Sequence, residues 1–390
     1  MHDVVMPGMR AIEDEMIAVR RTIHAHPELS FEEVATSGLV AERLERWGYQ
    51  VTRGLGVTGL VGTLKKGSGS TAIGIRADMD ALPIHEDTGL PYASSLPGKM
   101  HACGHDGHTA MLLAAAHYLA SDSCQFDGTV HLIFQPAEEG GGGAFRMLQD
   151  GLFERFPCDA VFAMHNMPGY PTGKLGFLPG PFMASADGVK ITITGYGGHG
   201  AMPHKTVDPV VVAASLVMAL QTIVARNVPP LETAVVTVGA IHSGEASNVI
   251  PDSAELQLCI RAMTHEVRSL LLERIEALAH GQASSYGARA EIELFDPYPP
   301  LINSEQETAF ARQVAVDWLG EGGLIQNLVP VTGSEDFAFM LEQRPGCYLL
   351  IGNGDGEGGC MVHNPGFDFN DDSLAIGASY WVKLVEAFLR

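Results

Sequence analysis

Residues 100–108 read MHACGHDGH, a stretch that contains one thiol, three imidazoles and one carboxylate. Cysteine and histidine are donors that suit Zn²⁺, Mn²⁺, Co²⁺ or Ni²⁺. In an extended segment or a tight loop, the spacing of Cys103 and His105 lets both side chains point the same way. On its own the pair has two interpretations, namely a pair of metal ligands or a buried, unreactive cysteine beside surface histidines. Residues elsewhere in the chain are needed to choose between these two interpretations.

The length and charge of the chain limit what it can be. At 390 residues the chain exceeds one ordinary domain, so we expect two. A net charge of -22 argues against nucleic acid or an anionic membrane surface as a partner. Residues 1–16 carry neither a basic segment followed by an apolar run nor a membrane span, and the six cysteines are sparse and unpatterned. We therefore expect a soluble, cytoplasmic protein.

Three apolar segments, each typical of a buried strand, lead into side chains that could take part in metal chemistry. These segments and the polar residues that follow them span 71–80, 128–139 and 159–165. In open α/β sheets, catalytic groups gather where the strands end. Together with residues 100–108, the three junctions predict one metal cluster at the carboxyl edge of a sheet.

The acidic residues at these junctions have more than one interpretation. Asp80, in the Asp78-Met79-Asp80 segment, could orient a metal ligand or a water, or the two aspartates could simply form a turn. If the backbone stays extended at Glu138 and Glu139, their side chains project to opposite sides. One carboxylate could then bind metal while the other acts as general base, although adjacent acids at a strand end are usually just solvated. The four glycines that follow suggest a close approach of the backbone to another group.

The middle of the chain has the pattern of a separate domain. Its predicted elements follow the order β-α-β-β-α-β, which is the split ferredoxin-like arrangement. They are a strand at 189–195, a helix at 208–226, strands at 233–241 and 254–261, a helix at 264–286 and a strand at 289–295. We predict an α/β fold in which a catalytic domain with a mixed sheet flanked by helices (residues 1–185 and 298–390) is split by an inserted α+β domain (residues 186–297).

Eight motifs follow one another along the chain: RADMDALP (76–83), HACGHDGH (101–108), QPAEEGGGG (135–143), MHN (164–166), GYGGHGAMPH (195–204), ASNVIPD (246–252), GSEDF (333–337) and VHNPGFDF (362–369). With this ordered set the sequence resembles the M20 metallopeptidase family, specifically its amidohydrolase branch of hippurate hydrolases, N-acyl-amino-acid amidohydrolases and auxin-conjugate hydrolases. The match starts at HAHPELSFEE (24–33) and covers nearly the whole chain.

The resemblance implies a site with two divalent metal ions and an inserted domain that mediates dimerisation. By resemblance the ligands are Cys103, His105, Glu139, His165 and His363, and Glu138 is the general base. The ions could be Mn²⁺, Zn²⁺, Co²⁺ or Ni²⁺. The resemblance also implies a homodimer or dimer-based oligomer in which His199 reaches the partner's active site and stabilises the oxyanion.

Two residues of the inserted segment are candidates for holding a substrate. Asn248 is one, and Arg261 could bind the carboxylate of an amino acid through two hydrogen bonds or form a surface ion pair instead.

The expected activity is hydrolysis of the amide bond of N-acyl amino acids, such as N-acetyl or N-benzoyl amino acids, to a carboxylic acid and a free amino acid. One alternative is a dipeptidase or carboxypeptidase with the same metal site. The free α-amine of a dipeptide would require a carboxylate in the acyl pocket, and no residue of the sequence is a clear candidate. Another alternative is a metal-binding protein without catalysis, which the loss of Glu138 or of a ligand would favour, but all of these residues are present.

Overall fold

The computed structural model describes residues 5–354 and 360–390, which fold into two compact units. The first unit comprises Met1–Gly180, Asn303–Val329 and Phe339–Arg390. The second comprises Pro181–Ile302 and Pro330–Ala338. Residues 330–338, which we expected in the catalytic domain, group with the second unit, where Val331 pairs with Met183 in a parallel β-bridge.

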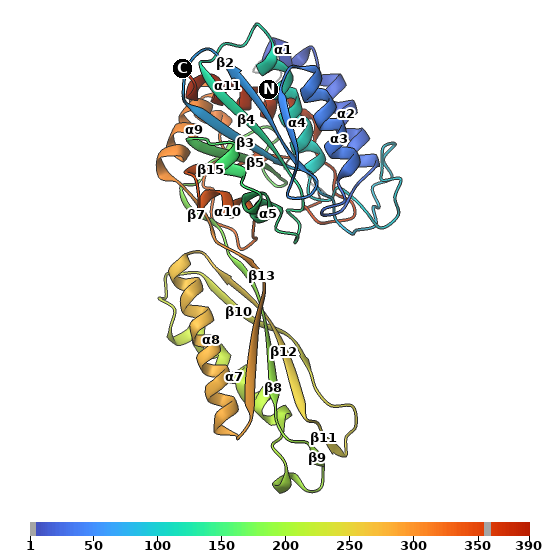
Figure 1. Cartoon of the computed structure of the whole chain (residues 1–390), viewed down its shortest axis with the longest axis vertical. Helices are drawn as coiled ribbons and strands as arrows, with labels where there is room; N and C mark the ends of the chain where they lie inside the picture. The colour runs from blue at the N-terminus through green and yellow to red at the C-terminus, as the bar shows by residue number, and fades with distance from the viewer. Residues whose placement is uncertain (1–4, 355–359) are drawn as a thin grey trace. The chain divides into compact units, whose positions relative to one another are not determined.

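The first unit is built on a mixed sheet of seven strands, in the order β1-β2-β4-β3-β5-β15-β6. These strands are β1 (Gln50–Leu55), β2 (Gly59–Lys66), β3 (Ala72–Asp78), β4 (Gly128–Gln135), β5 (Ala160–Met167), β6 (Leu175–Gly176) and β15 (Gly346–Gly352). Figure 1 labels β2, β4, β3, β5 and β15 of this sheet. The central strands β4, β3, β5 and β15 run parallel, whereas β1, β2 and β6 pair antiparallel with their neighbours. Every residue of β3 and β15 is buried, as expected for parallel strands covered on both faces.

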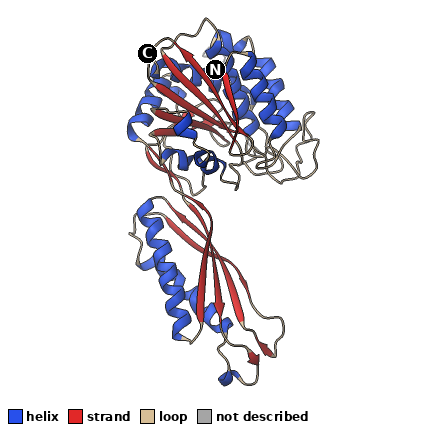
Figure 2. Ribbon diagram, viewed as in Figure 1, coloured by secondary structure: helices blue, strands red, loops and turns tan. Residues whose placement is uncertain are grey.

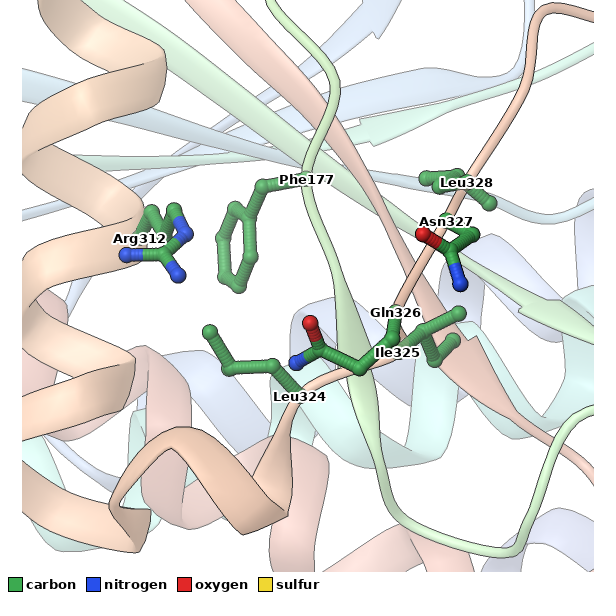
Figure 3. Close-up of a pocket in the computed structure, with 7 residues that line it drawn as sticks. All are labelled: Phe177, Arg312, Leu324, Ile325, Gln326, Asn327 and Leu328. Atoms are coloured by element: carbon green, nitrogen blue, oxygen red, sulfur yellow. The ribbon is translucent and has the colours of Figure 1, made fainter.

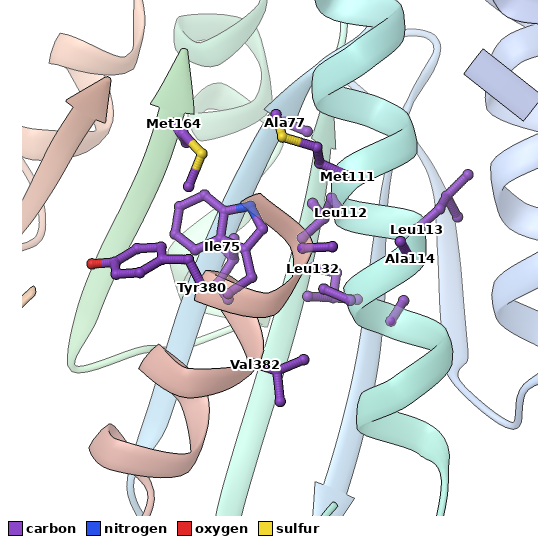
Figure 4. Packing of buried hydrophobic residues seen from close by; sticks show 14 of the residues in the cluster. Ile75, Ala77, Met111, Leu112, Leu113, Ala114, Leu132, Met164, Tyr380 and Val382 are labelled. Carbon is purple, nitrogen blue, oxygen red and sulfur yellow. The ribbon is translucent and has the colours of Figure 1, made fainter. Parts of the chain in front are cut away.

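Helices from both ends of the sequence lie against this sheet or against a helix that covers it. The main ones are α2 (Glu13–Ala25), α3 (Val34–Arg46), α4 (His105–Ala120), α9 (Glu305–Leu319) and α11 (Leu374–Phe388). Met111 of α4 and Tyr380 of α11 belong to one core with Ile75, Leu132 and Met164 of the sheet (Figure 4). The helix α4 is apolar on nearly all sides because it is buried between the sheet and the helices α2 and α11.

The second unit has the predicted β-α-β-β-α-β order. Its elements are β8 (Ala186–Thr194), α7 (Pro209–Arg226), β10 (Ala234–His242), β12 (Ser253–Ala262), α8 (His265–Ser285) and β13 (Arg289–Tyr298). The four strands form an antiparallel sheet in the order β10-β12-β8-β13, and both helices cover one face of it (Figure 2). Burial alternates along β8, as the sequence pattern predicted for a strand with one covered face. The predicted fold class is therefore confirmed.

The two long helices of the second unit, α7 and α8, each follow a residue whose side chain caps them. The side chain of Asp208 accepts a hydrogen bond from the Val210 amide, and Thr264 does the same for Val267. Among the described residues, α7 alone is long and apolar enough to cross a membrane by length and composition. Its inward side chains, including Leu216, instead belong to the core of this unit.

Candidate metal centre

The parallel strands β3, β4 and β5 direct three groups of polar residues to one edge of the first unit. Asp80 follows β3, Glu138 and Glu139 follow β4, and His165 lies near the carboxyl end of β5. Because these strands run in the same direction in adjacent positions, their carboxyl ends meet at the same edge of the sheet.

Cys103 and His105 reach this edge from the loop that leads into α4. Gly104 between them has a φ of +94°, a conformation that glycine adopts without strain. A β-carbon at Gly104 would lie only 2.2 Å from the Oδ1 atom of Asn166. Gly104 therefore allows the loop to turn tightly against β5, with a potential metal ligand, Cys103 or His105, on each side of it.

The five residues with predicted ligand roles lie together. The Sγ atom of Cys103 is 3.3 Å from Nε2 of His165, and Nε2 of His363 is 3.0 Å from Oε1 of Glu139. The Nε2 atom of His105 is 4.0 Å from the same Glu139 oxygen. Donor atoms of Cys103, His105 and His165 all lie within 4.8 Å of one another, as do those of Cys103, Glu139 and His363. This overlap of two donor groups at Cys103 is an arrangement that can hold two neighbouring cations.

His363 comes from a segment far along the chain. Its backbone amide donates a 2.7 Å hydrogen bond to the carbonyl of Ala102, so the C-terminal segment is fastened to the loop that carries Cys103. The side chain is about half exposed, whereas those of Cys103, His105 and His165 are buried. Of the five residues, His363 is thus the one on the open side of the cluster.

Glu138 is buried and lies beside the proposed ligands. Its carboxylate belongs to a group with His105 and Glu139 whose donor atoms are within 4.8 Å of one another. The backbone does not stay extended here, because Ala137 has a φ of +52° and the amide of Gly140 donates to the carbonyl of Glu138. The condition under which the sequence predicted opposite orientations for Glu138 and Glu139 is therefore not met, and a turn directs the two carboxylates instead.

Two of the four glycines after Glu139, Gly141 and Gly143, are in close contact with the turn. A β-carbon on Gly143 would lie 1.6 Å from the carbonyl oxygen of Pro136, and the Gly143 amide donates to the carbonyl of Ala137. This confirms the close approach of backbone that the run of glycines predicted.

The carboxylate of Asp80 contacts two residues of the site, Glu139 and His105. It accepts hydrogen bonds from the amide of Glu139 at 2.9 Å and from the hydroxyl of Ser30 at 3.0 Å. It also lies 3.2 Å from Nδ1 of His105. Burial alone would raise the pKa of Asp80, but the hydrogen bond with His105 holds it below its usual value. Asp80 therefore contacts both His105 and the backbone of Glu139, as the interpretation in which it orients a metal ligand requires.

Sequence reasoning missed a second buried network beside the site. Nδ1 of His108 is 2.6 Å from Oδ1 of Asp78, and its Nε2 is 2.7 Å from Oδ1 of Asn166. Asp78 also accepts from the guanidinium of Arg76 at 2.6 Å. Both ring nitrogens of His108 are thus engaged, which makes it a structural residue. The hydrogen-bond partners of His108, Asp78 and Asn166, come from the separate strands β3 and β5, so no sequence spacing could have revealed the network.

The chemistry of the donors fits divalent cations. Within residues 5–354 and 360–390, Nε2 of His105 is buried without a hydrogen-bond partner. Burial opposes protonation of His105, but Asp78 and Asp80 raise its pKa to about 10, so a cation at Nε2 would take the place of a proton. Burial and His108 lower the pKa of His165 well below the usual range, which favours the neutral imidazole that binds metals.

The Cys103 thiol lies in buried and negatively charged surroundings. Burial and the neighbouring carboxylates of Glu139 and Glu138 raise the pKa of Cys103 well above its usual value. A thiol in these surroundings would become a thiolate ligand when a divalent ion offsets the negative charge.

The other three candidate residues lie in the second unit. His199 is exposed on β9 (Gly198–His199), which pairs with β11 (Val249–Ile250), and the carbonyl of Asn248 accepts from the amide of Gly200. Arg261 lies near the opposite end of β12 from this ribbon, and its guanidinium donates to the carbonyl of Ile260. The structure thus brings His199 and Asn248 together but keeps Arg261 apart from them.

Arg261 borders a cavity of about 430 Å³ on the uncovered face of the sheet in the second unit, together with Cys259 and Phe295. In the first unit, a different pocket of about 240 Å³ lies next to α9 (Figure 3). Its lining residues are Phe177, Arg312, Leu324, Ile325, Gln326, Asn327 and Leu328. None of them is a candidate site residue, so this pocket is separate from the metal centre.

Comparison with known proteins identifies the family. A family model described as peptidase family M20/M25/M40 matches residues 74–387. A hippurate hydrolase from Campylobacter jejuni is 44% identical over 386 residues, which cover 99% of this chain and 100% of that protein. The thermostable carboxypeptidase 1 of Saccharolobus solfataricus is 38% identical over 376 residues, covering 95% of this chain and 94% of that protein.

A solved structure from the same family also matches this chain. A dinuclear metal binding peptidase from the M20 family of Bacillus subtilis superposes with a TM-score of 0.85 at 34% identity, covering 97% of this chain and 99% of that chain. The resemblance inferred from the eight motifs is therefore confirmed: the chain belongs to the peptidase family M20/M25/M40, in its amidohydrolase branch.

Proposed function

We propose that this amidohydrolase cleaves the amide bond of N-acyl amino acids, such as N-acetyl or N-benzoyl amino acids, and releases a carboxylic acid and a free amino acid. The observation that carries this proposal is the convergence of the five donor residues with the acid Glu138 beside them. The hippurate hydrolase, whose whole length the chain matches, supports an N-acyl amino acid as substrate.

Cys103, His105, Glu139, His165 and His363 would hold two divalent ions, with Mn²⁺, Zn²⁺, Co²⁺ and Ni²⁺ as the candidates. When bound, such ions lower the pKa of a water molecule and polarise the carbonyl of the amide. Asp80 keeps the ring of His105 oriented so that its Nε2 faces the other donors.

Glu138 is the proposed general base. Its carboxylate would accept a proton from the attacking water and then deliver it to the nitrogen of the leaving amino acid. Its burial and its position among the donor atoms support this role, since Glu139, the other acid of the turn, contacts His363.

The inserted segment of residues 186–297, which makes up most of the second unit, would serve as the dimerisation domain. Exposed apolar side chains on α7, including Val211 at 50% and Met218 at 71%, support an interface there. In a homodimer or dimer-based oligomer, His199 would act in the partner's active site, while Asn248 and Arg261 would hold the substrate. Sedimentation of a Met218→Glu variant tests the interface, and a wild-type chain that sediments as a monomer would refute it.

All six cysteines are free, which supports a reducing compartment, and we propose the cytoplasm.

A dipeptidase or carboxypeptidase is the second candidate function. The similarity to a thermostable carboxypeptidase favours it, because that relative is also matched over nearly its full length.

Metal-stripped protein should be reloaded with each of the four ions and tested on N-acetyl, N-benzoyl and indole-acetyl amino acids and on dipeptides. We expect release of the amino acid from the N-acyl substrates. The Glu138→Gln variant should lose about 100- to 10,000-fold of the rate while its metal content stays unchanged. Cleavage of dipeptides alone would favour the peptidase, and an unimpaired Glu138→Gln variant would refute the general-base assignment.

A further inference from the structure

We propose that Glu33, assisted by Ser30, is a positioning residue that fixes the turn carrying Glu138 and Glu139. The segment 28–33, between α2 and α3, contains no proposed ligand or base. This proposal rests on the proposed function, because it assumes that Glu138 is the base and Glu139 a ligand.

The segment lies against the strand end that leads to the site. Leu29 and Ala81 form a parallel β-bridge, and the amide of Ala81 donates to the carbonyl of Glu28 at 2.8 Å. The chain at 28–33 is thereby held beside Asp80. Its side chains can reach the turn after β4 although more than a hundred residues separate them in sequence.

Glu33 makes the first contact with the turn. Its side chain is fully buried, and its Oε1 atom accepts a 2.9 Å hydrogen bond from the amide of Ala137. The other oxygen accepts from the hydroxyl of Thr58. A buried carboxylate is costly unless donors satisfy it, so this acid stays in place because the turn and Thr58 supply them.

The residue that Glu33 holds has an unusual backbone. Ala137 has a φ of +52°, which a residue with a β-carbon rarely adopts. Its amide is held by Glu33 and its carbonyl by the amide of Gly143. Because Glu138 follows directly, the conformation of Ala137 sets the direction in which the Glu138 side chain leaves the backbone.

Ser30 makes the second contact through Asp80. The Ser30 hydroxyl donates to Oδ2 of Asp80, and the same oxygen accepts from the amide of Glu139. The backbone amides of Ala137 and Glu139, the two residues that flank Glu138, therefore both donate to buried carboxylates. The general base sits between two fixed points, one held by Glu33 directly and the other by Asp80 with support from Ser30.

The first test is a Glu33→Leu variant, which keeps bulk but removes the acceptor. We expect kcat to fall by up to about 100-fold at saturating metal, with a smaller change in KM, because the base is displaced. Amide hydrogen exchange of residues 137–143 should become faster. Glu33→Gln should recover much of the wild-type kcat and of the slow exchange at residues 137–143. The side-chain carbonyl of Gln can accept from the amide of Ala137, while the Thr58 hydroxyl rotates to accept from the side-chain amide of Gln.

Glu28→Leu is the matched control. Glu28 belongs to the same segment and its carboxylate also accepts two hydrogen bonds, from the amides of Ala35 and Thr36 at 2.9 Å each. These amides belong to α3 and not to the turn, so this variant should lower the melting temperature without changing kcat or exchange at 137–143. If Glu33→Leu does not fold, Ser30→Ala replaces it, with faster exchange at Glu139 as the expected result.

The outcomes separate this proposal from the proposed function. If Glu33→Leu or its replacement matches Glu28→Leu in both kcat and exchange, the positioning role is refuted while the proposed function stands. If the wild type cleaves no amide with any ion, the proposed function fails. The exchange of residues 137–143 then still decides whether Glu33 holds the turn.

Discussion

Replacement of Arg20 by methionine should destabilise the first unit strongly, because this guanidinium is buried among carboxylates. Its Nε is 2.9 Å from Asp371, one Nη is 2.9 Å from Asp368, and the other is 3.6 Å from Asp106. The side chains of Arg20 and Asp106 are fully buried. Replacing Arg20 removes the cation that these three carboxylates share, and losing one partner of a buried ion pair costs about 3–5 kcal/mol.

The neighbouring Arg21 is the matched control for this measurement. It contacts the same Asp371 at 2.7 Å, but its side chain is 45% exposed, so Arg21→Met should cost less than about 1 kcal/mol. In scanning calorimetry, at about 2 °C per kcal/mol, the Arg20 variant should melt roughly 6–10 °C below the wild type and the Arg21 variant within about 2 °C of it. Equal shifts for the two variants would refute the reasoning that burial gives the Arg20 contacts their strength.

Three further predictions concern the site and the stability of the fold. Asp80→Asn should weaken metal binding by about 10- to 100-fold in competition with a chelating dye. Asparagine has one acceptor oxygen where Asp80 has two, so either His105 or the amide of Glu139 loses its hydrogen-bond acceptor. Gly143→Ala should abolish activity and lower the melting temperature because its β-carbon would meet Pro136, whereas Gly142→Ala, with open space around it but a φ of +64°, should cost only about 1–2 kcal/mol. Burial lowers the pKa of His131 from 6.5 to about 4, so the unfolded chain takes up a proton that the folded chain excludes. Stability should therefore fall as the pH drops from about 6.5 to about 4, and His131→Asn should flatten this slope in urea titrations.

Strand ends were the most informative feature of the sequence. The runs that became β3, β4 and β5 are rich in apolar and β-branched residues, which identifies them as strands without any knowledge of their partners. Once parallel strands are assumed, their carboxyl ends must share an edge, so the neighbourhood of Glu139 and His165 follows from topology. His363 could not be reached in this way, because it lies in a loop fastened to Ala102 and not at the end of a strand.

The buried charges were not predictable from local pattern. Arg20 lies on α2, where an arginine normally faces solvent, and its partners Asp368 and Asp371 lie about 350 residues further along the chain. Periodicity reports which residues of a helix are apolar, but it does not report which charged residue will meet a distant partner. Such pairs arise only when the N-terminal helix and the C-terminal segment pack together.

The two adjacent acids illustrate where sequence reasoning reaches its limit. Glu138 and Glu139 are chemically identical, so any difference in their roles has to come from their surroundings. The amide of Glu139 is bound by Asp80 and its carboxylate contacts His363, whereas Glu138 follows the left-handed residue Ala137. If Ala137 relaxed to a negative φ, the direction of the next side chain would change with it, and the proposed division into ligand and base would be lost. The specificity of the pair therefore depends on the backbone of the turn, and this backbone is held by residues that themselves take no part in the reaction.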